Sequence, residues 1–559
     1  MSDKGRKNPA SMGRLEREAL AEIAATKVSK AWALAITVAF SAMLAWIFIA
    51  DAKNFARLAQ VEKVINTAQS IDQQNADNSD QTIFSKVFAF NRELMRWISS
   101  TENQLFEKSQ VVKQLQPFGQ AAFASMREGA KEVMIGRDGW LFHRPSFDLL
   151  THKLNKTTND FTGPEAAIKA IGSFAEALDE RGIKLAIMPT WPKTAGQPEP
   201  LGISASHDNP IQKPEWFDAW SAEVQKTGAY LYDSADSILK AKSAQNGIAY
   251  LRTDSHWNPL TMMTCARDLA DVLVENNWIT RGSETALTLE REITNEGDLA
   301  RMLRLPKTWK NFTTEKTSVS EVRTKSKERW LPNRQSPVLL LGDSYSNIFS
   351  LKSMGWGEDA GFSEHLGACL GFPVDCILRN GDGANATRAE LSAELARGRD
   401  RLEGKKLVVW QFSATELTAG NWKPMSYQLG IHFNSQEFLE ISAGDSRKVD
   451  ATITAMGPVP HPASTVYKDY VGYFELELVP DTSATPSAGT KVFAFGLVIE
   501  NRQWTQLATL RPGDKINVTL DSWSDAENEF GRHQRAEPDG ELALEPPNWI
   551  RQVEPRPDP

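Results

Sequence analysis

Short apolar strands alternate with amphipathic helices through the middle of the chain. GPEAAIKAIGSFAEALDERG predicts a helix with Pro164 in its first turn, and the following IKLAIMPT predicts a strand. Further strands are predicted at AYLYDS, SPVLLLGDS, PVDCILRN and KKLVVWQFS, and another helix at TMMTCARDLADVLVENN. This alternation indicates an α/β domain over residues 131–421, in which helices flank a largely parallel sheet.

The pattern changes after residue 421, where the apolar positions follow strand spacing. VDATITA, YFELELV, TKVFAFGLVIE and DKINVTL predict strands separated by turns such as RPGD. Residues 422–535 are therefore expected to form a small β-barrel or sandwich. The segment 536–559 is rich in proline and acidic residues and is expected to be a poorly ordered tail.

One uncharged apolar run stands near the beginning of the chain. Residues 31–50 read AWALAITVAFSAMLAWIFIA, about the length that crosses a bilayer core, and they predict a transmembrane anchor. Residues 1–30 carry seven Lys or Arg against four Asp or Glu, which places this tail in the cytoplasm and the rest of the chain in the periplasm. A cleaved signal peptide is the competing interpretation. Residues 51–130 are predicted to form a helical spacer.

Composition and charge add little to this picture. A net charge of -8 over 559 residues is mild and gives no basic field for nucleic acid. Of three cysteines, Cys369 and Cys376 are close enough in sequence to pair, but buried free thiols are the favoured interpretation. No Cys/His spacing resembles a zinc site, and no metal or cofactor is expected.

Ser344 stands where an apolar strand meets the next helix, in VLLLGDSYSN. A serine on such a turn is exposed at the carboxyl end of the sheet. The N–H groups of the following helix are suited to stabilise the oxyanion formed when the serine attacks an acyl carbonyl. The alternative is that Ser344 only caps the helix, because serine is a preferred N-cap residue.

Asp254 and His256 lie two residues apart in LRTDSHWNP. In an extended chain both side chains face the same way, so the carboxylate can hold the imidazole while its other nitrogen accepts the serine proton. Together with Ser344 they predict a Ser/His/Asp acyl-transfer site.

Four motifs carry a family resemblance: GRDGWLF from Gly136, TDSHWNP around His256, LLLGDSYS ending in Ser346, and WQFSATEL from Trp410. The stretch from about Gly136 to Leu417 resembles the SGNH-hydrolase-like domain of the alginate O-acetyltransferase group, periplasmic enzymes that acetylate exopolysaccharide. As in that group, the Asp-x-His-Trp element precedes the serine element. The resemblance implies that Ser344 is the nucleophile, His256 the base and Asp254 the orienting acid.

Four further residues are weaker candidates for substrate binding. Arg379, Gly383 and Asn385 lie in RNGDGANATR, where an oxyanion donor or a substrate-binding group is expected. Lys193 in PTWPK stands at another strand end. Contact with substrate is one interpretation of Lys193, and an ordinary surface lysine is the favoured one.

The resemblance implies an O-acetyltransferase that modifies a secreted, alginate-like polysaccharide through an acetyl-serine intermediate. It also implies a multi-pass membrane acyltransferase as the partner that delivers acetyl groups. Two alternatives stay open: a carbohydrate esterase using the same triad, and a non-catalytic, glycan-binding scaffold of a secretion complex.

Overall fold

The structure is a computed structural model of the chain. It describes residues 129–151, 161–203, 210–306, 314–381, 383–430, 438–462, 467–479, 490–536 and 545–555, with isolated positions elsewhere. The predicted span at 31–50 and spacer at 51–130 lie almost wholly outside these residues. Among the residues that are described, no helix combines the length and the apolar character that crossing a membrane requires.

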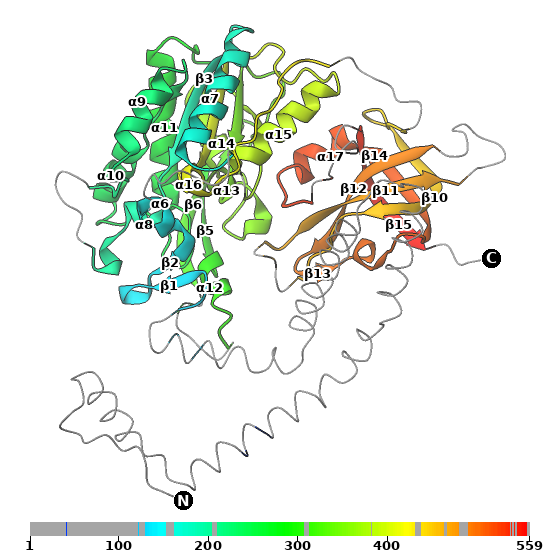
Figure 1. Cartoon of the computed structure of the whole chain (residues 1–559), viewed down its shortest axis with the longest axis horizontal. Coiled ribbons are helices and arrows are strands. Elements are labelled where there is room, and N and C mark those ends of the chain that lie inside the picture. Colours follow the sequence, from blue (N-terminus) through cyan, green and yellow to red (C-terminus); the bar gives the residue numbers. More distant parts are fainter. Residues whose placement is uncertain are drawn as a thin grey trace, which may run out of the picture. The chain divides into compact units, whose positions relative to one another are not determined.

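A five-stranded parallel sheet forms the centre of the first domain (Figure 1). Its strands run in the order β4-β3-β9-β7-β8: Tyr230–Leu231, Lys184–Thr190, Leu407–Ser413, Val338–Gly342 and Asp375–Leu378. Each coincides with an apolar run that the sequence marks as a strand, although β4 keeps only two residues. Such continuous apolar runs are expected when a sheet is covered on both faces.

Helices pack around this sheet. The principal ones are α7 (Pro164–Asp179), α9 (Phe217–Gln225), α10 (Ala235–Ala244), α11 (Pro259–Glu275), α14 (Phe362–Leu370) and α15 (Gly383–Ala396). In α7 the buried Ala167, Ile171, Phe174 and Leu178 recur every three or four residues and form its inner face. The fold class predicted from the apolar pattern is confirmed for the described residues.

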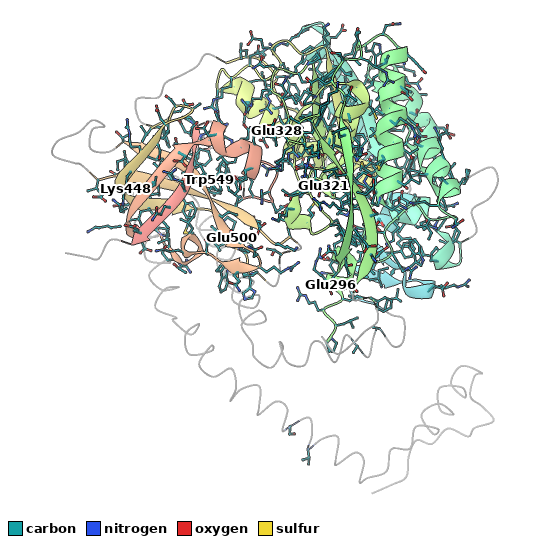
Figure 2. All side chains as sticks on the ribbon, turned by 180° about the vertical axis from the view of Figure 1, so that it is seen from behind. Glu296, Glu321, Glu328, Lys448, Glu500 and Trp549 are labelled. Atoms are coloured by element: carbon teal, nitrogen blue, oxygen red, sulfur yellow. The ribbon has the colours of Figure 1, made fainter. Side chains whose placement is uncertain are left out.

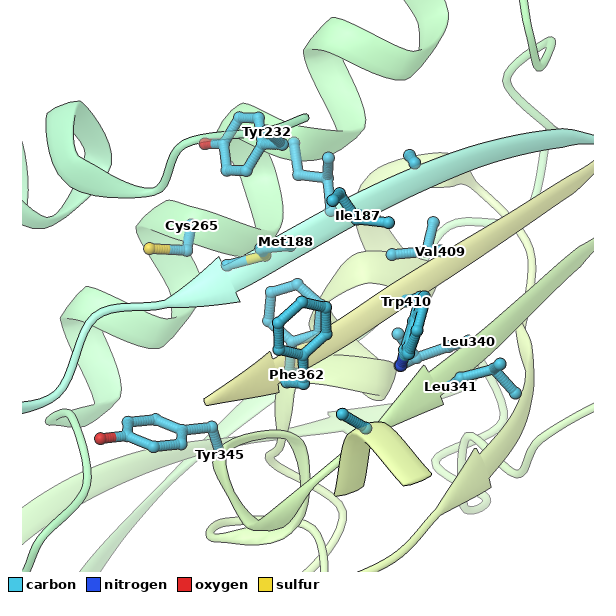
Figure 3. Packing of buried hydrophobic residues seen from close by; sticks show 14 of the residues in the cluster. Ile187, Met188, Tyr232, Cys265, Leu340, Leu341, Tyr345, Phe362, Val409 and Trp410 are labelled. Atoms are coloured by element: carbon cyan, nitrogen blue, oxygen red, sulfur yellow. The ribbon is translucent and has the colours of Figure 1, made fainter. Parts of the chain in front are cut away.

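The core of this domain lies between the strands and α14 (Figure 3). Leu340 and Leu341 of β7 and Val409 and Trp410 of β9 are fully buried, and Phe362 of α14 packs in the same cluster. Because β7 is held between β8 and β9, the turn that follows it has a rigid base.

Two short antiparallel pairs escaped the sequence analysis. One joins β1 (Val133–Ile135) to β2 (Leu141–His143), and the other joins β5 (Leu287–Asn295) to β6 (Glu315–Arg323). Figure 2 labels Glu321 on β6 and Glu296 just beyond the end of β5. Charged residues interrupt both longer strands, so their sequence carries no clear apolar signal. The short helix α12 (Asp298–Met302) begins directly after β5.

The C-terminal domain is a small closed β-barrel with a core of its own. Its strands are β10 (Ser446–Met456), β11 (Tyr470–Leu478), β12 (Lys491–Glu500), β13 (Gln503–Trp504), β14 (Lys515–Ser522) and β15 (Pro547–Pro555). The order β11-β10-β14-β15-β12 closes because β11 also pairs with β12. A helix, α17 (Trp523–Phe530), follows β14.

The prediction of a poorly ordered tail over 536–559 is wrong for its central part. Strand β15 pairs with β14 and β12, and Trp549 and Ile550 on it are buried. The side chain of Asn548 adds hydrogen bonds to the backbone of Leu439, Ile441 and Phe493. Prolines at both ends hid this strand, yet proline is tolerated at the first position of a strand.

All three cysteines are free thiols. Cys265 is buried, whereas Cys369 and Cys376 are partly exposed. Burial raises the pKa of Cys265, and it raises that of Cys376 to about 11. These thiols therefore stay protonated at neutral pH and are poor nucleophiles.

Candidate active site

Ser344 is the first residue of the short helix α13 (Ser344–Asn347), directly after β7 and Asp343. Asp343 is the N-cap residue, and its Oδ1 accepts the N–H of Tyr345 at 2.8 Å. The cap is therefore formed by Asp343, and the Ser344 hydroxyl is left for another role. Gly342 is required before it, because a Cβ there would lie 2.6 Å from Ser346 Oγ.

Gln411 of β9 fixes this turn from beneath. Its Nε2 donates to Asp343 Oδ1 at 2.8 Å, and its Oε1 accepts the N–H of Asp343 at 3.1 Å and the hydroxyl of Ser346 at 2.6 Å. The N–H of Ser413 completes the shell at Asp343 Oδ2. Since the Tyr345 N–H is engaged by the cap, it is not available as the oxyanion donor expected at this helix end.

Asp254 and His256 lie in a bent loop before α11, not in an extended strand. Asp254 Oδ1 accepts the backbone N–H of His256 at 3.2 Å as well as binding its ring, and this local turn presents both side chains together. Trp257, the next residue, donates from Nε1 to the carbonyl of Tyr345 at 3.1 Å. The loop is thereby tied to the serine turn.

The three predicted catalytic residues form one continuous chain of hydrogen bonds. Asp254 Oδ1 lies 2.6 Å from His256 Nδ1, and His256 Nε2 lies 2.9 Å from Ser344 Oγ. Asp254 and His256 are buried, and Ser344 is partly exposed. A carboxylate at Nδ1 requires the proton on that nitrogen, so Nε2 is free to accept the serine proton.

Local charges suit His256 to act as a base. Burial lowers the pKa of His256, but the hydrogen bond and charge of Asp254, together with Asp298 and Asp343, outweigh it and leave the pKa above 6.5. Burial by itself would raise the pKa of Asp254, yet His256 and Arg301 hold it well below its usual range. Asp254 therefore stays ionised and stabilises the imidazolium.

A second buried acid, Asp298, stands beside the pair. Its Oδ2 is 3.8 Å from His256 Nδ1, its Oδ1 accepts the N–H of Ser255 at 2.7 Å, and its own N–H donates to Asp254 Oδ2 at 3.0 Å. Burial and the charge of Asp254 raise the pKa of Asp298. The sequence gave no sign of this residue, which the hairpin β5–β6 delivers from more than forty positions away.

Asp254, His256 and Asp298 are also the one group in the described part of the chain whose ligand atoms are close enough together to hold a metal ion. Their donor atoms lie within 4.8 Å of one another. A metal bound through His256 Nδ1 would have to replace the 2.6 Å bond to Asp254. The hydrogen-bonded arrangement therefore fits proton transfer better than metal binding.

Lys193 is not the surface lysine that the sequence favoured. It is 3 % exposed, and its Nζ donates to the carbonyls of Leu251, Arg252 and Asp254 at 2.6–3.0 Å. Burial lowers the pKa of Lys193 to about 8. Its observed contacts support the backbone of the loop that carries Asp254.

Gly383 and Asn385 lie in the first turn of α15, which packs on the serine turn. A Cβ on Gly383 would lie 2.3 Å from Asp343 Cβ, so only glycine permits this approach. Arg379 is buried beyond the end of β8, and its guanidinium pairs with Glu390 at 3.3 Å. The structure thus brings Gly383 beside the nucleophile turn and joins Arg379 to an ion pair. Their roles toward substrate stay predictions.

Trp356 is a further contributor that the sequence did not reveal. Its Nε1 donates to Asp254 Oδ2 at 2.8 Å, and the residue is fully buried. Its order in the chain carries no signal, since it lies 102 residues from Asp254.

A parallel α/β sheet with a Ser/His/Asp chain at the carboxyl end of its strands defines a serine-dependent acyl-transfer class of domain. A profile of the SGNH hydrolase-like domain of the acetyltransferase AlgX matches residues 133–414, just over half of the chain. The chain belongs to this family.

Curated relatives and solved structures agree in name. A probable alginate O-acetylase AlgJ of Pseudomonas aeruginosa is 26% identical over 302 residues, covering 52% of this chain and 71% of that protein. The match to AlgJ of Pseudomonas syringae is 27% identical and covers 34% of this chain and 46% of that protein. The O-acetyltransferase domain of Pseudomonas putida AlgJ shares 20% identity, with 52% of this chain and 93% of that chain covered and a TM-score of 0.39.

Proposed function

We propose that this protein is an O-acetyltransferase that moves acetyl groups onto hydroxyls of a secreted, alginate-like polysaccharide through an acetyl-serine intermediate. The observation that carries the proposal is the hydrogen-bonded chain from Asp254 through His256 to Ser344, with contacts of 2.6 and 2.9 Å. Family membership and the names of the curated relatives support acetyl transfer and the alginate-like acceptor.

The first half-reaction forms the acetyl-serine. Ser344 Oγ attacks the acetyl carbonyl while its proton passes to His256 Nε2, and the donor group leaves with that proton. A bond forms between Oγ and the acetyl carbon as the bond to the donor breaks. Asp254 remains charged and holds the imidazolium in place.

The second half-reaction transfers the acetyl group. A sugar hydroxyl loses its proton to His256 Nε2 and attacks the acetyl carbon, and Ser344 Oγ then leaves and recovers a proton from the same nitrogen. The product is an O-acetyl ester on the glycan, and the free enzyme returns. If water takes the place of the sugar, the same residues give an esterase, so the acceptor decides between the two activities.

The proposal includes a place for the enzyme. We place the domain in the periplasm, held at the inner membrane by residues 31–50, with a multi-pass membrane acyltransferase supplying the acetyl groups. The apolar run and the basic excess in residues 1–30 support this topology. Protease added to spheroplasts should digest a tag at residue 559 but spare one at residue 1. A protected C-terminal tag would reject it.

The catalytic test uses the purified full chain, a chromogenic acetyl ester and an alginate oligosaccharide. Wild type should release chromophore, gain the mass of one acetyl group on Ser344, and yield acetylated oligosaccharide. Ser344→Ala should lower turnover by roughly four orders of magnitude. Ser173→Ala, on the exposed face of α7, is the matched control and should behave as wild type.

Two results would contradict the proposal. Release of acetate without any acetylated oligosaccharide would indicate the esterase. Full acetylation of the polymer in cells that carry only Ser344→Ala would indicate a scaffold instead of an enzyme.

A further inference from the structure

Tyr467 of the C-terminal barrel reaches the catalytic serine. It lies in the connection between β10 and β11 and packs against the hydrophobic core of the catalytic domain, not that of the barrel. Its side chain is hydrogen-bonded to that of Ser344, and Asp254, Asp298 and Asp343 are close enough to act on it electrostatically. A residue from the second domain thus contacts the reacting atom of the first.

Buried ion pairs hold the two domains together near this contact. Arg532, just after α17, pairs with Glu364 of α14 at 3.0 Å, and its carbonyl accepts from Asn347 Nδ2 at 3.4 Å. Arg535 pairs with Glu390 of α15 at 2.8 Å. Glu364 and Glu390 belong to the catalytic domain, and their partners belong to the C-terminal domain. The position of Tyr467 is therefore supported by charges that are costly to separate.

The direction of the hydrogen bond follows from the triad. Ser344 Oγ donates its own proton to His256 Nε2, because His256 Nδ1 already donates to Asp254. The serine oxygen can then only accept from a second neighbour, so the phenol of Tyr467 is the donor. Burial raises the pKa of Tyr467, which keeps the phenol protonated at any pH where the enzyme works.

We propose that Tyr467 is a catalytic residue supplied by the C-terminal barrel, whose hydroxyl stabilises Ser344 Oγ as the acetyl group leaves it. This inference rests on the acetyl-serine mechanism proposed above. In the transfer step the bond between Oγ and the acetyl carbon breaks and its electron pair stays on Oγ. His256 returns the proton to Oγ, while Tyr467 donates a hydrogen bond to it and keeps its own proton.

The two half-reactions respond differently to such a donor. During acylation Oγ is the nucleophile, and a hydrogen bond to it withdraws electron density and gives no acceleration. During transfer Oγ is the leaving group, and the same hydrogen bond stabilises the developing negative charge. Loss of the hydroxyl should therefore slow the second half-reaction and spare the first.

The test compares Tyr467→Phe with Tyr473→Phe in the full-length protein. Tyr473 lies on β11 of the same barrel and packs in a cluster of that domain, so it controls for removal of a hydroxyl there. Rapid mixing with 4-nitrophenyl acetate and an alginate oligosaccharide gives the burst of nitrophenol from acylation and the slower turnover from transfer. Thermal unfolding confirms that both variants are folded.

Tyr467→Phe should keep a burst of about one nitrophenol per enzyme and lower the following turnover about 10- to 100-fold, as expected for a lost hydrogen bond to a charged atom. The acetyl-serine should accumulate in its mass spectrum. Turnover equal to that of Tyr473→Phe, or a loss confined to the burst rate, would overturn the role of Tyr467. Absence of a burst and of the adduct in wild type would instead overturn the acetyl-serine mechanism itself.

Discussion

The indole nitrogen of Trp356 donates a 2.8 Å hydrogen bond to Oδ2 of Asp254, the oxygen that does not face His256. The N–H of Asp298 binds the same oxygen at 3.0 Å. Both oxygens of the buried carboxylate are therefore occupied, which fixes its plane and, through it, the orientation of the imidazole. Such outer contacts determine how well a catalytic constellation is preorganised.

Trp356→Phe should lower kcat about tenfold, because one hydrogen bond to the carboxylate of Asp254 is lost. Trp330→Phe is the matched control, since Trp330 is also buried and its Nε1 has no partner among the described residues. Steady-state kinetics and thermal unfolding should show similar losses of stability in both variants, but the drop in kcat in Trp356→Phe alone. Equal kinetics in the two variants would mean that Trp356 serves packing only.

The pH dependence should reflect His256, which must be neutral to accept the serine proton. Because its pKa is raised, kcat/KM should increase with pH and reach half its maximum above pH 6.5. The groups that face the imidazole are Asp254, Asp298, Asp343 and His143.

Asp298→Asn tests the contribution of the second acid. The amide keeps the size of the side chain but removes a group that raises the pKa of His256, so the acidic limb should move to lower pH by up to about one unit. The profile of kcat/KM against pH measures the shift. An unmoved limb would show that Asp298 is uncharged throughout the working range.

Lys193→Met should damage the loop that carries Asp254. Three carbonyl oxygens lose their donor, and the free energy of unfolding should fall by about 2 kcal/mol together with kcat. Lys240→Met, an exposed lysine on α10, is the control and should change neither. Chemical denaturation with a parallel activity assay makes the comparison. A stable but inactive Lys193→Met would point to contact with substrate instead.

Arg532→Gln should lower the free energy of unfolding by about 3 kcal/mol, since Glu364 is then buried without its partner. Adding Glu364→Gln removes the stranded charge and should restore part of this loss. A double-mutant cycle measured by denaturant unfolding gives the coupling energy. Additive effects would show that the pair contributes nothing to the joining of the domains.

The sequence by itself determined the strands and helices of the catalytic domain, because long apolar runs and helical periodicity are local properties. It also placed Asp254 and His256 on one loop and Ser344 at a strand end, since each motif is contiguous. The strand β15 was missed because charged and proline residues mask its apolar positions, and the exposed hairpin β5–β6 was missed because charges dominate it.

Tertiary structure alone decided which distant residues complete the site. Trp356, Asp298, Gln411 and Tyr467 come from four separate elements and meet around the triad. Their own neighbours in sequence say nothing of this meeting, because contacts between elements depend on sheet order and domain packing. The same packing made Lys193 a buried support for the loop, a role that its position at a strand end did not indicate.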